Sequence, residues 1–107
     1  MTQVQVVYWR DIPAQVKARL GSERQARPLS SRFQEAIDAA AMRAGAVGTD
    51  AYLEEWRTAE SGERVGTPAD VAAAAADELE QLYPPERLWR LIENEGREQS
   101  ATSAQTS

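Results

Sequence analysis

The sequence predicts an α+β fold in two layers: a three- or four-stranded, mainly antiparallel sheet with two helices packed on one face. Strand-like runs of apolar and alternating residues fill the first 30 positions. Two later segments repeat apolar residues at helical spacing, which gives the order ββ(β)αβα. With 107 residues the chain has room for one domain with one modest core. We expect this domain to span residues 1–92, and residues 93–107, rich in Ser, Thr and Gln, to form a disordered tail.

Residues 3–10 form the first expected strand, because Val, Tyr and Trp dominate the run and no helical spacing connects them. Apolar side chains on both of its faces indicate a central strand. The segment Arg10-Asp11-Ile12-Pro13 then turns the chain, since proline fixes φ and lacks a donor. Residues 14–29 are expected to form a hairpin around Gly21-Ser22. The side chains expected on its solvent face are Lys17, Arg19, Gln25 and Arg27.

Ser30 and Ser31 are expected to precede the first helix, and Ser31 as the N-cap residue matches a capping box together with Gln34. It should end near Ala44, because Gly45 suits the left-handed residue that follows a helix. Its apolar stripe is mostly alanine, which permits a close approach to the sheet.

Residues 46–66 allow two interpretations. Residues 50–57, DAYLEEWR, can form a short capped helix, or residues 52–60 can form a strand. We favour the strand, because a sheet that starts with three strands has room for another. Ser61-Gly62 then closes that strand as a turn.

The second long helix is expected after Thr67, an N-cap residue, with Pro68 at the first helical position. Pro84-Pro85 should stop it. The residues expected on its buried side are Val71, Ala75, Leu79 and Leu82. Residues 86–92 form a last amphipathic turn or two, whose apolar side chains either close the core or present a handle to a partner. These side chains are Leu88, Trp89, Leu91 and Ile92.

The composition limits the chemistry, because the chain has neither cysteine nor histidine. The usual zinc, haem and iron–sulfur ligand sets cannot be assembled, and the commonest general base near neutral pH is missing. Glu54 and Glu55 would point to opposite faces of a strand, and Asp77, Glu78 and Glu80 lie on a polar helix face. No phosphate-binding loop, nucleophile elbow or dinucleotide fingerprint is present. We expect no enzyme activity, no metal and no cofactor.

Charge is distributed unevenly along the chain, whose net charge is −5. Residues 1–50 hold seven Lys/Arg against five Asp/Glu, and residues 51–107 hold five against twelve. Overall acidity disfavours nucleic-acid binding, and no aromatic residues interleave with the basic ones as in RNA-binding sheets. Weak RNA binding is therefore a minor alternative. With neither a signal peptide nor an apolar run of about 20 residues, we expect a cytoplasmic protein without membrane contact.

The corner after the first strand is one candidate site for a protein partner or ligand. Tyr8 and Trp9 offer stacking surface, and Arg10 offers a bidentate donor for a carboxylate or phosphate. Trp56 is a further candidate contact. The alternative is that the aromatic rings pack in the core and Arg10 pairs with Asp11 or a helix carboxylate.

The hairpin is a second candidate site, because its basic residues could bind an anion or an acidic partner. These residues are Lys17, Arg19, Arg24 and Arg27. The alternative is a solvated face whose charges deter edge-to-edge association. The basic hairpin of one copy could also pair with the acidic half of another, which makes a homodimer a further candidate assembly.

Four segments together resemble the small bacterial virulence-factor domain family. They are QVVYWRDIPAQVKAR, SSRFQEAIDAAAMRAG, DAYLEEWR and TPADVAAAAADELEQLYPPERL. The resemblance covers about residues 3–88, and YWRDIPAQV and DAYLEEWR are its most specific parts. Members of that family are free-standing or joined to HEAT-like repeats, as in conserved virulence factor C. This chain shows no repeats and is similar to the free-standing form.

The resemblance implies no biochemical activity and supplies no catalytic or ligand residues. Some members are encoded near folate- and corrinoid-dependent one-carbon enzymes, which implies an accessory role in methyl transfer as an alternative function. From the residues and the resemblance together, we expect a non-enzymatic accessory module that binds a protein partner.

Overall fold

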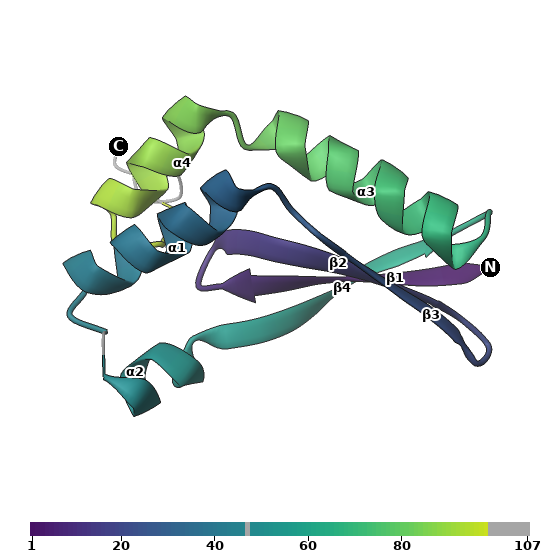
Figure 1. Ribbon diagram of the computed structural model, residues 1–107, viewed down its shortest axis with the longest axis horizontal. Helices are drawn as coiled ribbons and strands as arrows, with labels where there is room; N and C mark the ends of the chain where they lie inside the picture. Colours follow the sequence, from purple (N-terminus) through teal and green to yellow (C-terminus); the bar gives the residue numbers. More distant parts are fainter. Residues whose placement is uncertain (47, 99–107) are drawn as a thin grey trace, which may run out of the picture.

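The structure is a computed structural model that describes residues 1–46 and 48–98. Figure 1 shows its elements coloured along the chain. In chain order they are β1 (Thr2–Trp9), β2 (Ile12–Leu20), β3 (Glu23–Pro28), α1 (Ser31–Arg43), α2 (Thr49–Glu54), β4 (Trp56–Arg64), α3 (Pro68–Leu82) and α4 (Pro85–Glu93).

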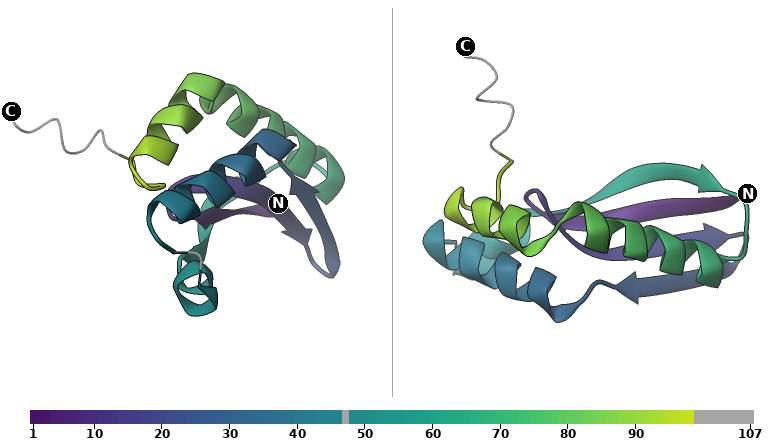
Figure 2. Two further views of the ribbon diagram at one scale, coloured as in Figure 1. Left: turned by 60° about the vertical axis from the view of Figure 1, so that its left-hand side comes forward. Right: turned by 90° about the horizontal axis from the view of Figure 1, so that it is seen from above.

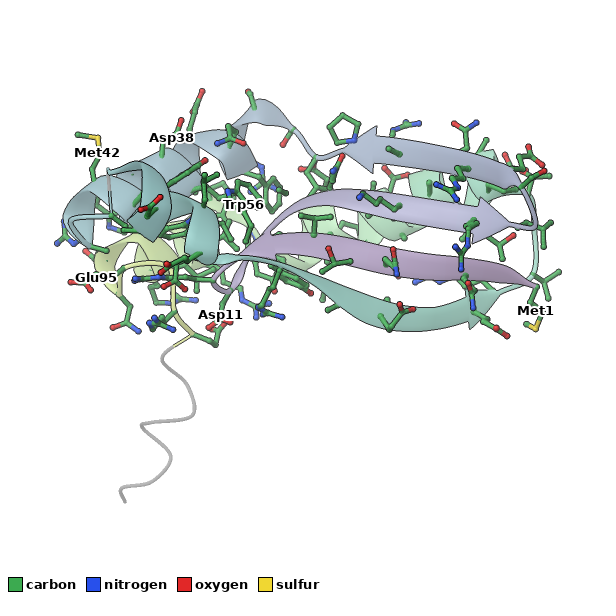
Figure 3. All side chains as sticks on the ribbon, turned by 90° about the horizontal axis from the view of Figure 1, so that it is seen from below. Met1, Asp11, Asp38, Met42, Trp56 and Glu95 are labelled. Carbon is green, nitrogen blue, oxygen red and sulfur yellow. The ribbon has the colours of Figure 1, made fainter. Side chains whose placement is uncertain are left out.

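The strands form one antiparallel sheet in the order β3-β2-β1-β4. Helix α3 packs across β1, β2 and β3, and α1 packs against β2 and α4, so these helices form a layer on one side of the sheet (Figures 1 and 2). The other face of the sheet is left uncovered over most of its length (Figure 3). The predicted two-layer α+β fold is confirmed, and two short helices, α2 and α4, join the expected pair.

The pattern of buried residues follows from strand alternation. On β1, Val4 and Val6 point toward the helices and are buried, whereas Gln3 and Gln5 point to the uncovered face. Strand β1 has strands on both sides, as its apolar composition predicts. The core between the two layers is completed by Trp9, Ile12 and Val16 of the sheet, Phe33 and Ile37 of α1, Val71 and Ala75 of α3, and Leu88 and Leu91 of α4.

Strands β2 and β3 form the predicted hairpin, but β2 begins at Ile12 rather than at residue 14. The predicted turn over residues 10–13 is corrected at Ile12-Pro13, because both residues pair with β1 and the chain turns at residues 10–11. The register of the hairpin explains which side chains share a face. Gly21 has a φ of +63°, as tight two-residue turns require. The turn pairs Leu20 with Glu23, and the same register continues along both strands.

Residues 46–66 contain both of the structures that the sequence allowed. Helix α2 occupies Thr49–Glu54 and strand β4 starts at Trp56, so the favoured strand over 52–60 was wrong in its first half. Trp56 begins the strand because it pairs with Trp9 of β1. The predicted turn at Ser61-Gly62 was also wrong. These residues lie inside β4, where Gly62 adopts a φ of +94° at a β-bulge opposite β1.

The N-terminus of α1 is capped differently from the prediction. The N-cap is Ser30, one residue earlier than expected, and the predicted capping box of Ser31 and Gln34 does not form. Ser30 donates its backbone N–H and its hydroxyl to the carboxylate of Glu80 on α3, at 2.7 and 2.9 Å. The Gln34 amide donates to Asp38 instead. A carboxylate from another helix therefore sits at the positive end of α1, where it is favourable.

The ends of α1 and α3 otherwise follow their local signals. Gly45 has a φ of +74° just after α1, and the Thr67 hydroxyl accepts the N–H of Asp70 at the start of α3, as expected. The buried side of α3 was partly mispredicted, because Leu82 is 58% exposed. Tyr83, the next residue, takes the inward position and packs edge-on against Phe33.

Replacement of Glu80 tests the link between α1 and α3. Burial opposes ionisation of Glu80, but the hydrogen bonds from Ser30 and the Arg32 guanidinium outweigh this effect and hold the pKa of Glu80 below its ordinary value. A lowered pKa gives stability that is complete at neutral pH and is lost as the pH falls through that pKa. Since the carboxylate is 30% exposed, we expect Glu80→Gln to lower the free energy of unfolding by about 1 kcal/mol at pH 7.

The difference between wild type and Glu80→Gln should shrink toward zero in thermal melts recorded from pH 7 down to pH about 3. Glu35→Gln is the matched control, because Glu35 is an exposed carboxylate on α1. A difference that stays constant over this pH range would contradict the proposed role of the charge.

Candidate functional site

Trp9 was the central residue of the predicted corner site, and the structure buries it completely. Its indole N–H donates to the carbonyl of Tyr52 in α2 at 2.9 Å, and the two rings stack with centroids 5.9 Å apart. Trp56 is half-buried and packs edge-on against the same tyrosine. The prediction of Trp9 as a partner contact is therefore corrected, because its ring has no exposed surface. For Trp9 the alternative, in which the aromatic ring packs in the core, is confirmed.

Arg10 is also used within the molecule. It has a left-handed φ of +53°, which is unusual for a residue other than glycine. This conformation turns the chain and lets its N–H donate to Glu55 O at 3.1 Å. Its guanidinium lies over the Trp9 ring, donates to Glu95 O at 2.8 Å and forms an ion pair with the Glu55 carboxylate at 3.5 Å. The side chain is only 12% exposed, so the prediction of Arg10 as a partner contact is corrected. Its ionic partner is Glu55 rather than Asp11.

Asp11 anchors the residues that follow α4. Its N–H donates to Gly96 O at 2.8 Å, and its carboxylate accepts the N–H of Glu98 at 2.6 Å and the guanidinium of Arg57 at 3.2 Å. We call residues 94–98 the C-terminal strap. The predicted tail from residue 93 is corrected, because α4 includes Glu93 and the strap is bonded to the corner. The rest of the predicted tail lies outside the described residues.

Tyr8 is the remaining aromatic residue of the corner. It is partly buried, and the guanidinium of Arg57 lies over its ring, 4.5 Å from the centroid. Arg57 also donates from Nε to Arg10 O at 3.0 Å. The corner, the strap and the start of β4 therefore form one interlocked unit, and its aromatic and guanidinium groups contact each other.

The basic residues of the hairpin divide between the two faces of the sheet. Arg19 pairs with Arg24 and Lys17 pairs with Ala26, so Lys17, Arg19 and Arg24 point to the uncovered face. Arg27 pairs with the buried Val16 and lies on the helix side. The prediction that Arg27 and Gln25 share a face with Lys17 and Arg19 is therefore corrected. The two-residue turn at Gly21-Ser22 sets the register of the hairpin. The position of this turn in the sequence therefore predicts which residues of the two strands share a face.

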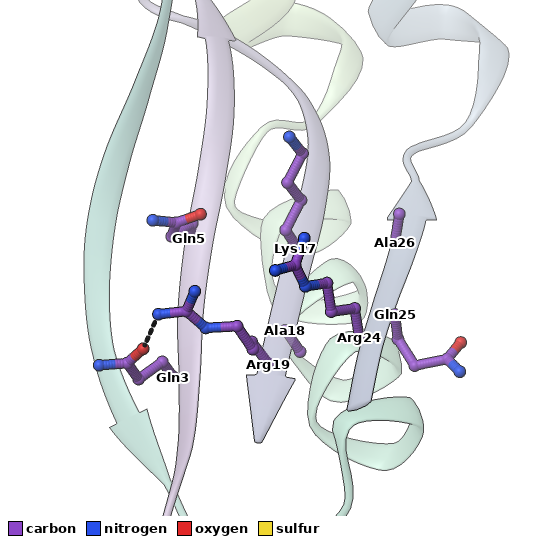
Figure 4. Close-up of a pocket in the computed structure, with 8 residues that line it drawn as sticks. All are labelled: Gln3, Gln5, Lys17, Ala18, Arg19, Arg24, Gln25 and Ala26. Carbon is purple, nitrogen blue, oxygen red and sulfur yellow. Dashed lines mark hydrogen bonds between the residues drawn. The ribbon is translucent and has the colours of Figure 1, made fainter. Parts of the chain in front are cut away.

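The uncovered face carries a hollow of about 390 Å³ over β1, β2 and β3 (Figure 4). We call it the basic trough. Arg19 reaches across it and donates to the Gln3 amide oxygen at 2.8 Å. Among the described residues, Lys17, Arg19 and Arg24 form no ion pair. The residues that line the trough are Gln3, Gln5, Lys17, Ala18, Arg19, Arg24, Gln25 and Ala26.

Charge changes sign across the uncovered face. Glu60 and Glu63 of β4 pair with Gln5 and Gln3 of β1, which places them beside the trough on the same face. Glu60 accepts a hydrogen bond from the Gln5 amide at 2.6 Å. The face therefore runs from basic at β3 and β2, through the amides of β1, to acidic at β4. The basic side can hold an anion, and it offers hydrogen-bond donors without a group that exchanges protons near neutral pH.

The apolar side chains of α4 differ in how deeply they are buried. Leu88 and Leu91 are buried and close the core, whereas Trp89 is 60% exposed. Trp89 and the partly buried Ile92 line a shallow hollow of about 320 Å³ between α4 and α1, together with Arg32. The alternative in which this segment closes the core is thus confirmed for Leu88 and Leu91, and a partner contact through Trp89 stays a prediction.

In residues 1–46 and 48–98, no three His, Cys, Asp or Glu side chains lie together as a metal site requires. No helix within the part of the chain that the structure describes has the length and apolar composition needed to cross a membrane.

Comparison with known proteins places the sequence in a family. Residues 7–92 match the model of a family described as virulence factor. No curated protein and no solved structure matches the chain. The matched range includes the corner, the hairpin, helices α1 to α3 and all but the last residue of α4, which agrees with the resemblance seen in the sequence.

A pair of glycine replacements tests the contact between the strap and the corner. Gly96 has a φ of +88°, and a Cβ there would lie 2.9 Å from Cζ3 of the buried Trp9. Gly45 has a similar φ of +74° but open space around it. Gly45→Ala should cost about 1 kcal/mol for its backbone conformation, and Gly96→Ala should cost about 1–3 kcal/mol more because of the clash. Urea unfolding measures both, and equal losses would contradict the packing of Gly96 on Trp9.

Proposed function

Since the chain belongs to the virulence factor family, whose name describes a phenotype and no reaction, we propose that it is a non-enzymatic binding module. In this proposal it acts in the bacterial cytoplasm and docks an acidic surface of a partner protein into the basic trough. The observation that carries the proposal is the set of three cations, Lys17, Arg19 and Arg24, that share the uncovered face without an ionic partner among the described residues.

The use of the corner residues within the molecule supports this choice of surface. Trp9 is buried, Arg10 and Asp11 form hydrogen bonds with the strap, and Arg57 donates to Arg10 and Asp11. The trough, in contrast, leaves its ammonium and guanidinium groups at the surface. Electrostatic complementarity of this kind favours specific and fast association with a partner of opposite charge.

The chemistry of the trough supports binding rather than catalysis. Its side chains are ammonium, guanidinium and amide groups, which orient and neutralise an anion but do not act as a general base near neutral pH. The acidic residues beside it, Glu60 and Glu63, lie on exposed positions of an edge strand. They would repel a second negative surface, so they limit where an acidic partner can lie.

A second candidate function is suggested by the size of the trough. A hollow of about 390 Å³ falls in the range of small-molecule sites, and three cations around it suit the carboxylates or phosphate of a folate or corrinoid cofactor. This would make the chain an accessory subunit in methyl transfer. Thermal melts with folates and cobalamins test it, since a bound ligand raises the melting temperature; an unchanged melting temperature across such a panel would eliminate it.

Charge reversal in the trough tests the proposed function. Lys17→Glu combined with Arg19→Glu should reduce quantitative capture of a specific partner from extracts of the native cell by at least about tenfold. The control is Arg43→Glu combined with Arg90→Glu, which makes the same change in net charge on exposed helix positions. Capture should survive in the control. Equal capture by the two double variants would contradict the trough as the docking surface.

A further inference from the structure

We propose that the partner is held as an extended acidic segment that adds to the free edge of β3 as a fifth strand, with its carboxylates over the basic trough. This inference rests on the proposed function and specifies how the partner docks. Addition of a strand to an exposed sheet edge is a common mode of peptide recognition, in which backbone hydrogen bonds give affinity and alternate side chains give specificity.

The sheet has two edges, and they differ in their ability to accept a strand. β4 forms one edge, and its bulge at Gly62 interrupts regular pairing. β3 forms the other edge, pairs with β2 without a register shift, and is exposed at all six of its residues. The regular edge is therefore the one beside the basic trough.

The alternation of the backbone shows which groups of β3 are free. Leu29, just after β3, donates its N–H to Ala14 O on the β2 side. Because successive residues of a strand point their backbone groups to opposite sides, Gln25 and Arg27 bond to β2, and Arg24 and Ala26 present their N–H and C=O groups to the free edge. Pro28 lacks an N–H, so regular pairing ends there.

The side chains at this edge select an acidic segment. Arg24 and Ala26, the residues with outward backbone groups, are also the ones whose side chains lie on the trough face. Residues of an added strand opposite them would place their side chains on the same face. On that face Arg24 forms a cross-strand pair with Arg19, and Ala26 forms the next pair with Lys17. The small side chain of Ala26 leaves room for a carboxylate to approach Lys17. A basic segment would be repelled by the same groups.

Backbone amide exchange distinguishes strand addition from other ways of binding. The experiment uses the full ¹⁵N-labelled chain and two synthetic peptides, one that alternates Glu with Thr and one that alternates Lys with Thr. The Glu peptide should slow exchange of the Arg24 and Ala26 amides at least about tenfold, because these gain hydrogen bonds. Exchange at Gln25 and Arg27, which already bond to β2, should change much less. The Lys peptide should not bind, and added salt should weaken binding of the Glu peptide.

Two replacements of one residue provide the matched test. Ala26→Pro removes the outward N–H but leaves the β2–β3 hydrogen bonds in place, since proline is tolerated where an edge N–H faces solvent. Ala26→Val keeps the N–H and suits a strand. We expect Ala26→Pro to weaken binding of the Glu peptide at least about tenfold and Ala26→Val to bind like wild type. Amide spectra of both variants report whether the sheet is intact.

The outcomes separate this inference from the proposed function. Equal peptide binding by both Ala26 variants, or binding without protection of the Arg24 and Ala26 amides, would overturn strand addition while the trough remains a docking surface. No binding of the Glu peptide would also overturn it, and the charge-reversal capture experiment then decides the proposed function separately. Self-association of the chain that competes with the Glu peptide would assign the edge to a second copy and overturn the choice of a partner segment.

Discussion

The buried indole of Trp9 is the contact on which the arrangement of the corner, α2 and the strap depends. Its N–H is bonded to Tyr52 in α2, its ring supports the guanidinium of Arg10, and Gly96 packs against it without room for a side chain. One residue near the start of the chain thus positions a helix from the middle and the strap from the end. These contacts use the Trp9 ring and the Arg10 guanidinium within the molecule, and our proposal therefore places partner binding on another surface.

The uncovered face of the sheet results from where the helices pack. Helix α3 and helix α1 both pack on the side of the sheet that carries Val4 and Val16, so the opposite side meets solvent. Strand alternation then requires polar side chains there, and this sequence supplies amides on β1, cations on β2 and β3, and carboxylates on β4. The same alternation that builds the core therefore creates the charged face, and the order of the strands places its basic half beside the regular edge.

Elements with local signals could be predicted from the sequence, and those fixed by distant contacts could not. The Gly21-Ser22 turn, Gly45 and Thr67-Pro68 each act on adjacent residues, so the hairpin turn, the end of α1 and the start of α3 were predicted correctly. The cap of α1 depends on Glu80, 50 residues away, and the strap depends on Arg10, 85 residues from Glu95. The division between α2 and β4 depends on pairing of Trp56 with Trp9. The face of Arg27 was predictable, because the two-residue turn fixes the hairpin register.

The burial of Trp9 can be measured directly by fluorescence. Replacing Trp56 and Trp89 by Phe leaves Trp9 as the single tryptophan of the chain. The account predicts a short-wavelength emission that acrylamide quenches weakly, both in the free protein and with an acidic peptide bound, because the indole belongs to the core in both states. Long-wavelength emission that acrylamide quenches strongly would contradict it, and would return the corner to the surface as a binding site.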